Sequence, residues 1–445
     1  MMMGWPSRIW VALVFASVGA PAAADGILDS YQAARQNDPS FRAARYELEA
    51  GRLALPIARA GLLPVVSASS ARYKNKGDRS FTTGAIPNQP LDYRYEQDSL
   101  NLRQPLFNYE AWARYRLGET QVAYHEALFG QREADLATRV LGAYLNVLLA
   151  KDEVSLAEAA VKAFEEQLRS ASRRLAGGEG TRTEQAEVEA RLRIAEAALI
   201  ETKDRLAVAV RLLEDITGKP GVNLRGLRAD FVPFRLAPDN LDEWIAIGQD
   251  RSPEIRAQRF VLEAAGHEVD RNRAGHLPTL DLVASVSDGT NESVTSLNQT
   301  ITTRSLGVQL SIPLYRGGQT SAATEQAVAN RNKSQSELDA TINKVSLEVR
   351  RQFLLAQSGF DKIDAYARSV RASEVALEGT KKGFQAGIRT NVDVLDAQRQ
   401  LILTQRDLAQ ARYEFLLNSL KLRAVAGTLM EKDIVDLDGQ LEPPG

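Results

Sequence analysis

Apolar residues recur at every seventh position through much of the second half of the chain. One series leads into a turn at Gly383–Asp396, and a second series follows it. The first consists of Ile342, Val349, Ala356, Ile363, Val370, Leu377 and Phe384, and the second of Leu401, Leu408, Phe415 and Leu422. A seven-residue repeat is typical of helices that supercoil around their neighbours. The pattern therefore predicts long helices over about residues 319–384 and 391–426, joined as a hairpin.

The first half carries an earlier copy of this hairpin, with helices predicted over about residues 108–176 and 183–216. Its two series are Val140, Val147, Val154, Val161, Leu168 and Leu175, then Leu192, Leu199, Leu206 and Leu213. A displacement of 209 residues aligns them with the later series and pairs Gly178 with Gly387. A displacement of 207 would align Gly180 with Gly387 but breaks both series. We therefore predict an internal repeat offset by 209 residues.

Before each helical hairpin the apolar period changes to two, which indicates β-strands. In the second half, strands are predicted over about residues 278–288 and 300–313, with one apolar face and one face of small polar residues. In the first half they are predicted over about residues 63–82 and 91–106. The alternation there slips between Tyr95 and Leu100, which suggests a bulge or an excursion beyond a membrane.

The chain thus contains one plan twice: helix, β-hairpin, long helix, helix. Asp38-Pro39 and Ser252-Pro253 mark equivalent helix starts, since proline suits the first helical position. The predicted segments are a first repeat at 25–218, a proline-rich linker at 219–240, a second repeat at 241–428, and a short acidic tail at 429–445 without a domain of its own.

The N-terminal residues 1–24 are expected to be a secretory signal peptide. Arg8 precedes the apolar run Ile9–Gly19, and Ala22–Ala24 offers a small-residue cleavage site. The alternative is an uncleaved anchor, but the run is too short to span a bilayer as a helix. No later stretch resembles a helical membrane span.

Composition narrows the function by exclusion. A net charge of −2 argues against a nucleic-acid partner. The absence of cysteine excludes disulfides, thiolate metal sites and a lipidated N-terminal cysteine. The three histidines lack metal-ligand spacing, and no nucleophile elbow or phosphate-binding loop is present. We expect neither an enzyme nor a bound metal or cofactor.

Four strands cannot close a barrel, for which about eight is the smallest workable number. Unpaired strand edges in lipid would cost several kcal/mol per group, so a membrane location requires several chains to pool their strands. The small polar face suits a water-filled lumen. Aromatic residues where strand gives way to helix suit a membrane interface, the alternative being core packing; they are Phe107, Tyr109, Trp112, Tyr115 and Tyr315.

Small residues on the long helices, such as Ala143, Ala150 and Ala157, suit a wall of helices in which each contacts two neighbours. The alternative is a two-stranded coiled coil. That alternative would make the protein a soluble periplasmic scaffold or adaptor, extractable without detergent and unable to conduct ions.

The chain resembles the TolC-type outer-membrane channel proteins over nearly all of its mature length. The resemblance is strongest in the stretch GFQAGIRTNVDVLD at Gly383–Asp396 and continues at Ala411–Tyr413 and Ala426–Leu429. It implies a homotrimer with a twelve-stranded outer-membrane barrel on a long periplasmic helical barrel. Such a passive duct serves type I protein secretion or multidrug efflux, with a periplasmic adaptor and an ABC-type or proton-driven inner-membrane pump. The missing lipid-anchor cysteine favours protein secretion.

The resemblance also places a periplasmic gate. Arg389 matches the gate arginine, and Phe384 stands where the family has a tyrosine, so that a hydroxyl hydrogen bond is missing. Thr183 and Glu184 fall at the family's Thr-Asp pair. We expect Glu184 to pair with Arg389, a bond worth about 1 kcal/mol if exposed. A gate with fewer bonds than the family type follows.

Two further sites come from the same match. Asp393 and Asp396 match carboxylates that line the entrance, where threefold symmetry would make rings that favour cations. The alternative is that they are ordinary helix-start acids stabilised by the helix dipole. Gly178, Gly180 and Gly387 leave backbone exposed at the tips, where the adaptor docks in the family; the alternative is turn chemistry alone.

Overall fold

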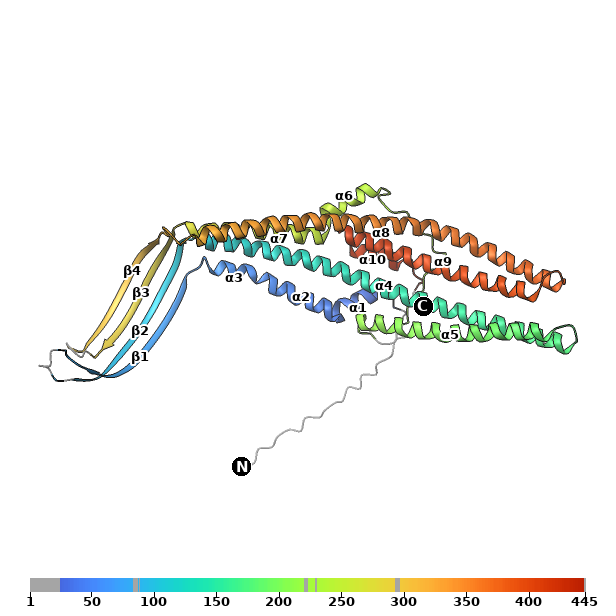
Figure 1. The fold of residues 1–445 in the computed structure, drawn as a ribbon, viewed down its shortest axis with the longest axis horizontal. Coiled ribbons are helices and arrows are strands. Elements are labelled where there is room, and N and C mark those ends of the chain that lie inside the picture. Colours follow the sequence, from blue (N-terminus) through green and yellow to red (C-terminus); the bar gives the residue numbers. More distant parts are fainter. Residues whose placement is uncertain are drawn as a thin grey trace, which may run out of the picture.

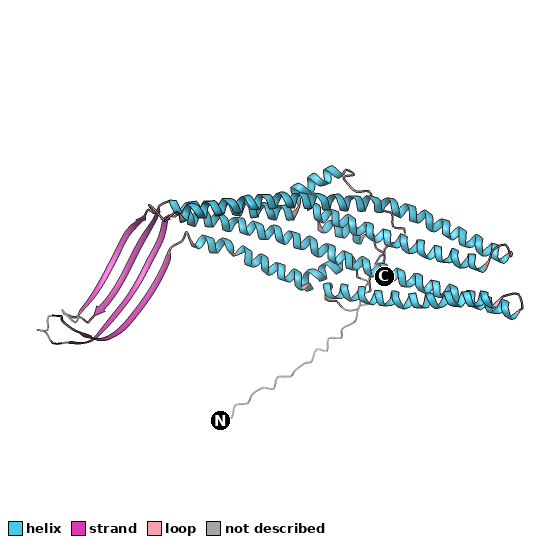
Figure 2. Cartoon of the chain, in the orientation of Figure 1, coloured by secondary structure: helices cyan, strands magenta, loops and turns pink. Residues whose placement is uncertain are grey.

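The computed structural model describes residues 25–82, 87, 89–219, 223–228, 230–292 and 297–443. The expected signal peptide at residues 1–24 lies outside this part of the chain. The molecule is elongated, with a β-sheet at one end and the turns of two helical hairpins at the other (Figure 1). Figure 2 shows that the strands are all gathered at the sheet end, while helices make up the remaining length. The molecule therefore has two structurally distinct parts along one axis.

The elements follow the repeated plan. The first repeat contains α1 (Ile27–Asn37), α2 (Pro39–Arg52), α3 (Ala54–Ala60), β1 (Val65–Arg79), β2 (Gln89–Phe107), α4 (Tyr109–Ala176) and α5 (Arg182–Thr217). The second contains α6 (Leu241–Arg251), α7 (Pro253–Arg273), the 3-10 turn η1 (Ala274–His276), β3 (Thr279–Asn291), β4 (Gln299–Ser311), α8 (Gln319–Gln385) and α9 (Asn391–Ala426), and α10 (Glu431–Asp438) follows. The predicted class, mainly α with four strands in two tandem repeats, is confirmed.

The offset of 209 residues is visible in the backbone itself. Equivalent positions share their special geometry: Gly178 and Gly387 both have positive φ, Thr181 and Thr390 are both helix N-caps, and Gly218 and Gly427 are both left-handed C-caps. An offset of 207 would match none of these pairs. The two hairpins are therefore structural copies, and differences between their side chains have functional meaning.

The helices lie side by side as a curved wall. Near the sheet, α4 lies between α3 and α7, and α7 contacts α8; towards the tips, α4 lies between α5 and α9, and α9 contacts α8 (Figure 1). At 68 residues, α4 is about 100 Å long at 1.5 Å per residue. It runs from the sheet to the tips, as α8 does with 67 residues, so these two helices fix how the sheet is placed relative to the tips.

The main core lies midway along the wall, where α1, α4, α5, α9 and α10 meet. The Tyr144 side chain is fully buried there, and its hydroxyl donates to the carbonyls of Asp25 at 3.1 Å and Arg225 at 2.8 Å. Tyr413 donates to the Asp152 carboxylate at 2.7 Å, which connects α9 with α4. The Tyr413–Asp152 bond joins the two repeats at their middle, and the Tyr144 bonds fix the start of the first repeat and the linker to α4.

The linker and the tail take part in this core, which the sequence pattern did not reveal. Phe231 is buried, and Phe234 meets Phe415 edge to face with 5.1 Å between ring centroids. In the tail, expected only to be short and acidic, α10 buries Ile434 and Leu437, and Asp438 forms an ion pair with Arg225 of the linker. Linker and tail therefore brace each other across the wall.

The four strands form one antiparallel sheet in the order β1-β2-β3-β4, so the repeats are joined between β2 and β3. Pairing of β1 with β2 is continuous from Val65–Arg79 to Gln89–Arg103, so the suggested bulge between Tyr95 and Leu100 is absent. The apolar residues change face there while the backbone stays regular. The irregularity lies instead between Pro105 and Phe107, where proline lacks the N–H that a ladder needs.

If α10 belongs to the core, Ile434→Ala should lower the free energy of unfolding by about 2–4 kcal/mol, because a buried side chain leaves a cavity. Val435→Ala is the matched control, since Val435 is the next residue and is 46% exposed. Thermal unfolding of the protein in detergent measures both. Equal, small effects of the two variants would show that α10 does not contribute to the core.

Candidate functional site

One face of the sheet is mainly apolar, with Gln104 beside Leu282 and Arg304 beside Val286 as the polar members of its apolar rows. Paired rows run from Val66 through Leu102 and Ala284 to Leu306, and neighbouring rows add Leu100, Val286, Leu282, Val308, Leu280 and Leu310. Leu306 is 77% exposed and Val308 is 61% exposed. Beyond these rows the same face turns charged, with Arg72 paired to Asp98 at 2.8 Å. The sheet therefore exposes an apolar band with a polar outer border.

The opposite face carries small polar side chains. Ser69 bonds to Ser99 at 2.8 Å, and Ser285 bonds to Ser305 at 2.6 Å. Close to the helices, Arg103 pairs with Asp281 at 2.7 Å on the same face. This surface can face water, while the apolar face cannot do so without cost.

The expected aromatic interface residues lie at the strand–helix junctions and are exposed on the single chain. Tyr315 is 86% exposed, Phe107 48%, Trp112 46% and Tyr109 37%. Trp112 stacks on Tyr115 with 5.5 Å between centroids. The alternative of core packing is therefore absent from the single chain, and the rings are free for contacts outside it.

At the other end, the α4–α5 turn is held by its own backbone. Gly178 has a φ of +80°, and the N–H groups of Glu179 and Gly180 donate to the Arg174 carbonyl at 2.9 and 3.1 Å. A side chain at Gly180 would lie only 2.9 Å from the Leu175 nitrogen. Thr181 then caps α5 by accepting from the Glu184 N–H at 3.1 Å. The glycines thus have a structural role irrespective of any docking.

The expected Glu184–Arg389 pair is absent from the chain. Glu184 instead accepts from Arg174 of its own hairpin, with 2.5 Å between Oε1 and Nη2. A glutamate at this position reaches back across the hairpin, whereas the Arg389 stem lies over Gly383 of its own hairpin. Thr183, placed with Glu184 at the gate by the family match, is exposed, and Thr181 is the capping residue.

Arg174 also reaches the second hairpin. Its guanidinium carbon lies 4.5 Å from the centroid of the Phe384 ring, near the end of α8. Sequence reasoning missed Arg174, because in the first hairpin the family match names only Thr183 and Glu184, which follow the turn. A basic residue in the last turn of α4 was the available signal, but helix-dipole compensation explains such a residue equally well.

Arg389 is exposed at the second tip, with its aliphatic stem over Gly383: a side chain at Gly383 would come within 2.8 Å of the Arg389 Cγ. Next to it, Asp393 closes a capping box. It accepts from the Thr390 N–H at 2.8 Å and donates its own N–H to the Thr390 hydroxyl at 3.2 Å. The bond from the Thr390 N–H, followed by that from its hydroxyl, holds the pKa of Asp393 below its usual range.

Asp396, the other entrance carboxylate, pairs with Arg191 of α5 at 3.0 Å. This second link between the hairpins was also missed in the sequence. Below it, Leu395 of α9 is buried among α4 and α5 residues, in a cluster with Phe164, Val188 and Leu192. The tips of one chain are therefore held together by one apolar cluster and two arginines.

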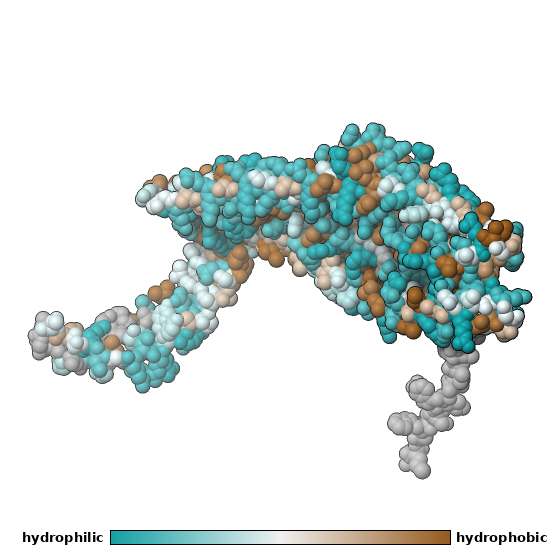
Figure 3. Space-filling view, turned by 45° about the vertical axis from the view of Figure 1, so that its right-hand side comes forward, coloured by the Kyte–Doolittle hydropathy of each residue, from teal (hydrophilic) through white to brown (hydrophobic). Residues whose placement is uncertain are grey.

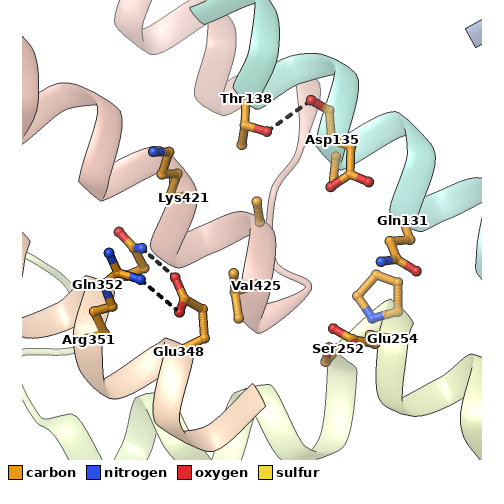
Figure 4. A pocket seen from close by; sticks show the side chains of 13 residues that line it. Gln131, Asp135, Thr138, Ser252, Glu254, Glu348, Arg351, Gln352, Lys421 and Val425 are labelled. Carbon is orange, nitrogen blue, oxygen red and sulfur yellow. Dashed lines mark hydrogen bonds and ion pairs between the residues drawn. The ribbon is translucent and has the colours of Figure 1, made fainter. Parts of the chain in front are cut away.

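A pocket of about 290 Å³ lies further from the tips, between α4, α7, α8 and α9 (Figure 4). Two of its carboxylates have protein partners: Glu348 accepts from Gln352 at 2.6 Å, and Glu254 pairs with Lys344 at 2.7 Å. Burial raises the pKa of Asp135 on the α4 side. The pocket is a polar junction of helices.

In the part of the chain that the structure describes, no three histidine, aspartate or glutamate side chains come together as metal ligands would. Over the same residues, no helix combines the length and apolar character needed to cross a membrane.

Comparison with known proteins places these features in a family. The model of the outer membrane efflux protein family matches residues 30–219 and 244–428. The chain is 37% identical over 433 residues to the proteases secretion protein PrtF of Dickeya chrysanthemi, covering 96% of this chain and 94% of PrtF. It is 26% identical to the outer membrane protein TolC of Vibrio cholerae, covering 98% of each.

Solved structures of outer-membrane channels have the same fold. The Campylobacter jejuni CmeC outer membrane channel superposes with a TM-score of 0.79 at 15% identity, covering 99% of this chain and 98% of CmeC. The matched segments of the family model coincide with the two structural repeats. The apolar sheet face, the paired hairpins and these matches together show that the chain belongs to the outer membrane efflux protein family, the TolC-type channels of the Gram-negative outer membrane.

Proposed function

We propose that this chain is the outer-membrane exit duct of a type I protein secretion system. Export through the outer membrane follows from the family, and the protein cargo is supported by the 37% identity to a proteases secretion protein over almost the whole length of both chains. The observation that carries the proposal is the open four-stranded sheet. Its apolar face is made for lipid and its serine-rich face for water.

The two long margins of the wall support a closed homotrimer. Strands β1 and β4 each have one unpaired edge, and the helices that continue from them expose apolar side chains. On the side of the wall that contains β1, α2, α3 and α5 expose Tyr46, Ile57, Ile194, Ile200 and Val208, and on the side that contains β4, α8 exposes Leu347, Leu354 and Val375. Apolar patches remain visible on the surface of the helical part (Figure 3). Joining unlike margins gives a ring if the rotation closes.

Three chains would pool twelve strands, which removes every unpaired edge. The helices would then continue the ring as a tunnel into the periplasm. The hairpin tips are its far end, where a periplasmic adaptor and an inner-membrane pump would dock. Gly178, Gly180 and Gly387 leave the turn backbone accessible, and Ile388 beside them is 80% exposed.

The direct test is assembly and conductance. The mature protein should occur in outer-membrane fractions as a heat-sensitive trimer, conduct ions in planar lipid bilayers, and restore protease release to cells that lack their own secretion duct. A monomer that is extracted without detergent and passes no ions would favour the alternative of a periplasmic coiled-coil scaffold. Conductance without restored protease release would separate the channel from the proposed cargo.

The orientation of the sheet can be tested at adjacent positions on β4. Leu306→Arg should cost about 2–4 kcal/mol per chain, because arginine at mid-bilayer depth faces lipid. Ser305→Arg is the matched control on the opposite, water-facing side of the same strand. The yield of heat-sensitive trimer measures both. Normal assembly of Leu306→Arg with loss of trimer for Ser305→Arg would reverse the assigned faces.

The entrance carboxylates yield a further prediction. We propose that three copies of Asp396 form a cation-binding ring, and that Arg191 partly compensates its charge through the 3.0 Å pair. Asp396→Asn should weaken channel block by multivalent cations, and Arg191→Gln should strengthen it by freeing the carboxylate. Glu196→Gln on α5 serves as the control for a general change in charge. Block that is unchanged in the first two variants would place the cation site elsewhere.

A further inference from the structure

We propose that Arg174 is the cation that holds the two hairpins of one protomer together at the periplasmic tips, a role that the family match would give to Arg389. The proposal rests on the channel function above and names the residue on which its closed state depends. It makes Arg174 a positioning residue. Its partners are Glu184 within its own hairpin and the Phe384 ring of the other.

The contacts favour Arg174 over Arg389 on distance and burial. The Arg174 Nη2 lies 2.5 Å from the Glu184 Oε1, and the two side chains are only 27% and 20% exposed. The guanidinium carbon lies 4.5 Å from the Phe384 centroid, within the range of a cation–π contact. Arg389 is exposed, and its stem covers Gly383 of its own hairpin. Of Arg174 and Arg389, it is therefore Arg174 that contacts the other hairpin.

Comparison of the two repeats shows that only the first hairpin has an arginine at the position of Arg174. With the offset of 209 residues, Arg174 corresponds to Gly383 and Leu175 to Phe384. The first hairpin thus supplies the guanidinium, and the second supplies the ring and leaves the equivalent cation position empty of a side chain. Two copies of one hairpin have become complementary instead of identical.

The carboxylates at the equivalent positions Glu184 and Asp393 also have different partners. Asp393 in the second hairpin accepts from the backbone N–H of Thr390 at 2.8 Å and so completes its capping box. The corresponding Glu184 has the longer side chain and reaches Arg174 instead. Glutamate therefore holds the guanidinium close to the ring, and a guanidinium can stack on an aromatic face in a way that a lysine ammonium cannot.

Phe384 has no hydroxyl, so it cannot donate to a carboxylate as a tyrosine would. Its ring face nevertheless offers negative charge density to a cation. Moving the tip of the α8–α9 hairpin away from α4 requires the ring to leave the guanidinium. Separation of the hairpins, which would widen the tunnel at the tips, is thereby opposed.

The experiment compares single-channel conductance of purified trimers in planar bilayers. Arg174→Ala should raise the open fraction on the order of three- to tenfold, as loss of one cation–π contact per protomer would do. Arg173→Ala is the matched control: it removes an arginine from the adjacent position, where the side chain bonds only to the Arg169 carbonyl at 3.4 Å. Arg174→Lys should give an intermediate value, because the charge stays and the stacking is lost.

A double-mutant cycle tests the contact itself. Phe384→Leu should open the channel as much as Arg174→Ala does, and the double variant should open it no further. Phe384→Tyr retains the ring and should stay closed. The proposal is overturned if Arg174→Ala and Phe384→Leu conduct as wild type while Arg389→Ala opens the channel, or if the effects of the two variants add independently.

The behaviour of the wild-type trimer distinguishes failure of the Arg174 bridge from failure of the proposed channel function. If it assembles in the outer membrane and conducts, unchanged Arg174 variants reject the bridge alone. If the wild type neither forms a trimer nor conducts, the proposed function itself is wrong. Trimer yield is measured for every variant, so that loss of assembly is distinguished from loss of closure.

Discussion

A strand edge in lipid has no water to bond with, and this constraint shapes the whole molecule. The chain has four strands in one open sheet, with β1 and β4 as its edges. Each unpaired N–H or C=O in hydrocarbon costs several kcal/mol. An apolar sheet face and two open edges can coexist only if the edges of different chains pair. The four-stranded sheet is therefore one segment of a larger barrel formed by several chains.

The helical part follows from the same demand for partners. A wall about 100 Å long that is one helix thick has no interior of its own, so each helix must pack through its sides. Alanine and other small side chains allow this close approach. The exceptions are the core at the middle, where Tyr144 and α10 are buried, and the apolar cluster around Leu395 near the tips. Between the middle core and the Leu395 cluster, the helices expose apolar side chains that can pack against neighbouring chains.

Duplication of a hairpin gives two tips with the same backbone, and side-chain divergence then makes them interact. Thr181 and Thr390 cap equivalent helices, and Gly178 and Gly387 turn equivalent corners. The tips differ at two pairs of equivalent positions next to these caps and turns. Arg174 of the first hairpin corresponds to Gly383 of the second, and Glu184 corresponds to Asp393. The two hairpins thus share one backbone geometry, and their different side chains allow the proposed contact between Arg174 and Phe384.

The sequence by itself determined the repeat, its offset, the period-two strands and the long helices, because each depends on local periodicity or turn chemistry. It also placed Asp393 at the start of a helix, since an acid in the first turn is favoured by a local interaction with the helix dipole. Only the tertiary structure decided the partner of Glu184, the link from Arg191 to Asp396, and the place of α10 in the core. These contacts join residues of different elements, and the direction of a long side chain depends on the neighbours that surround it.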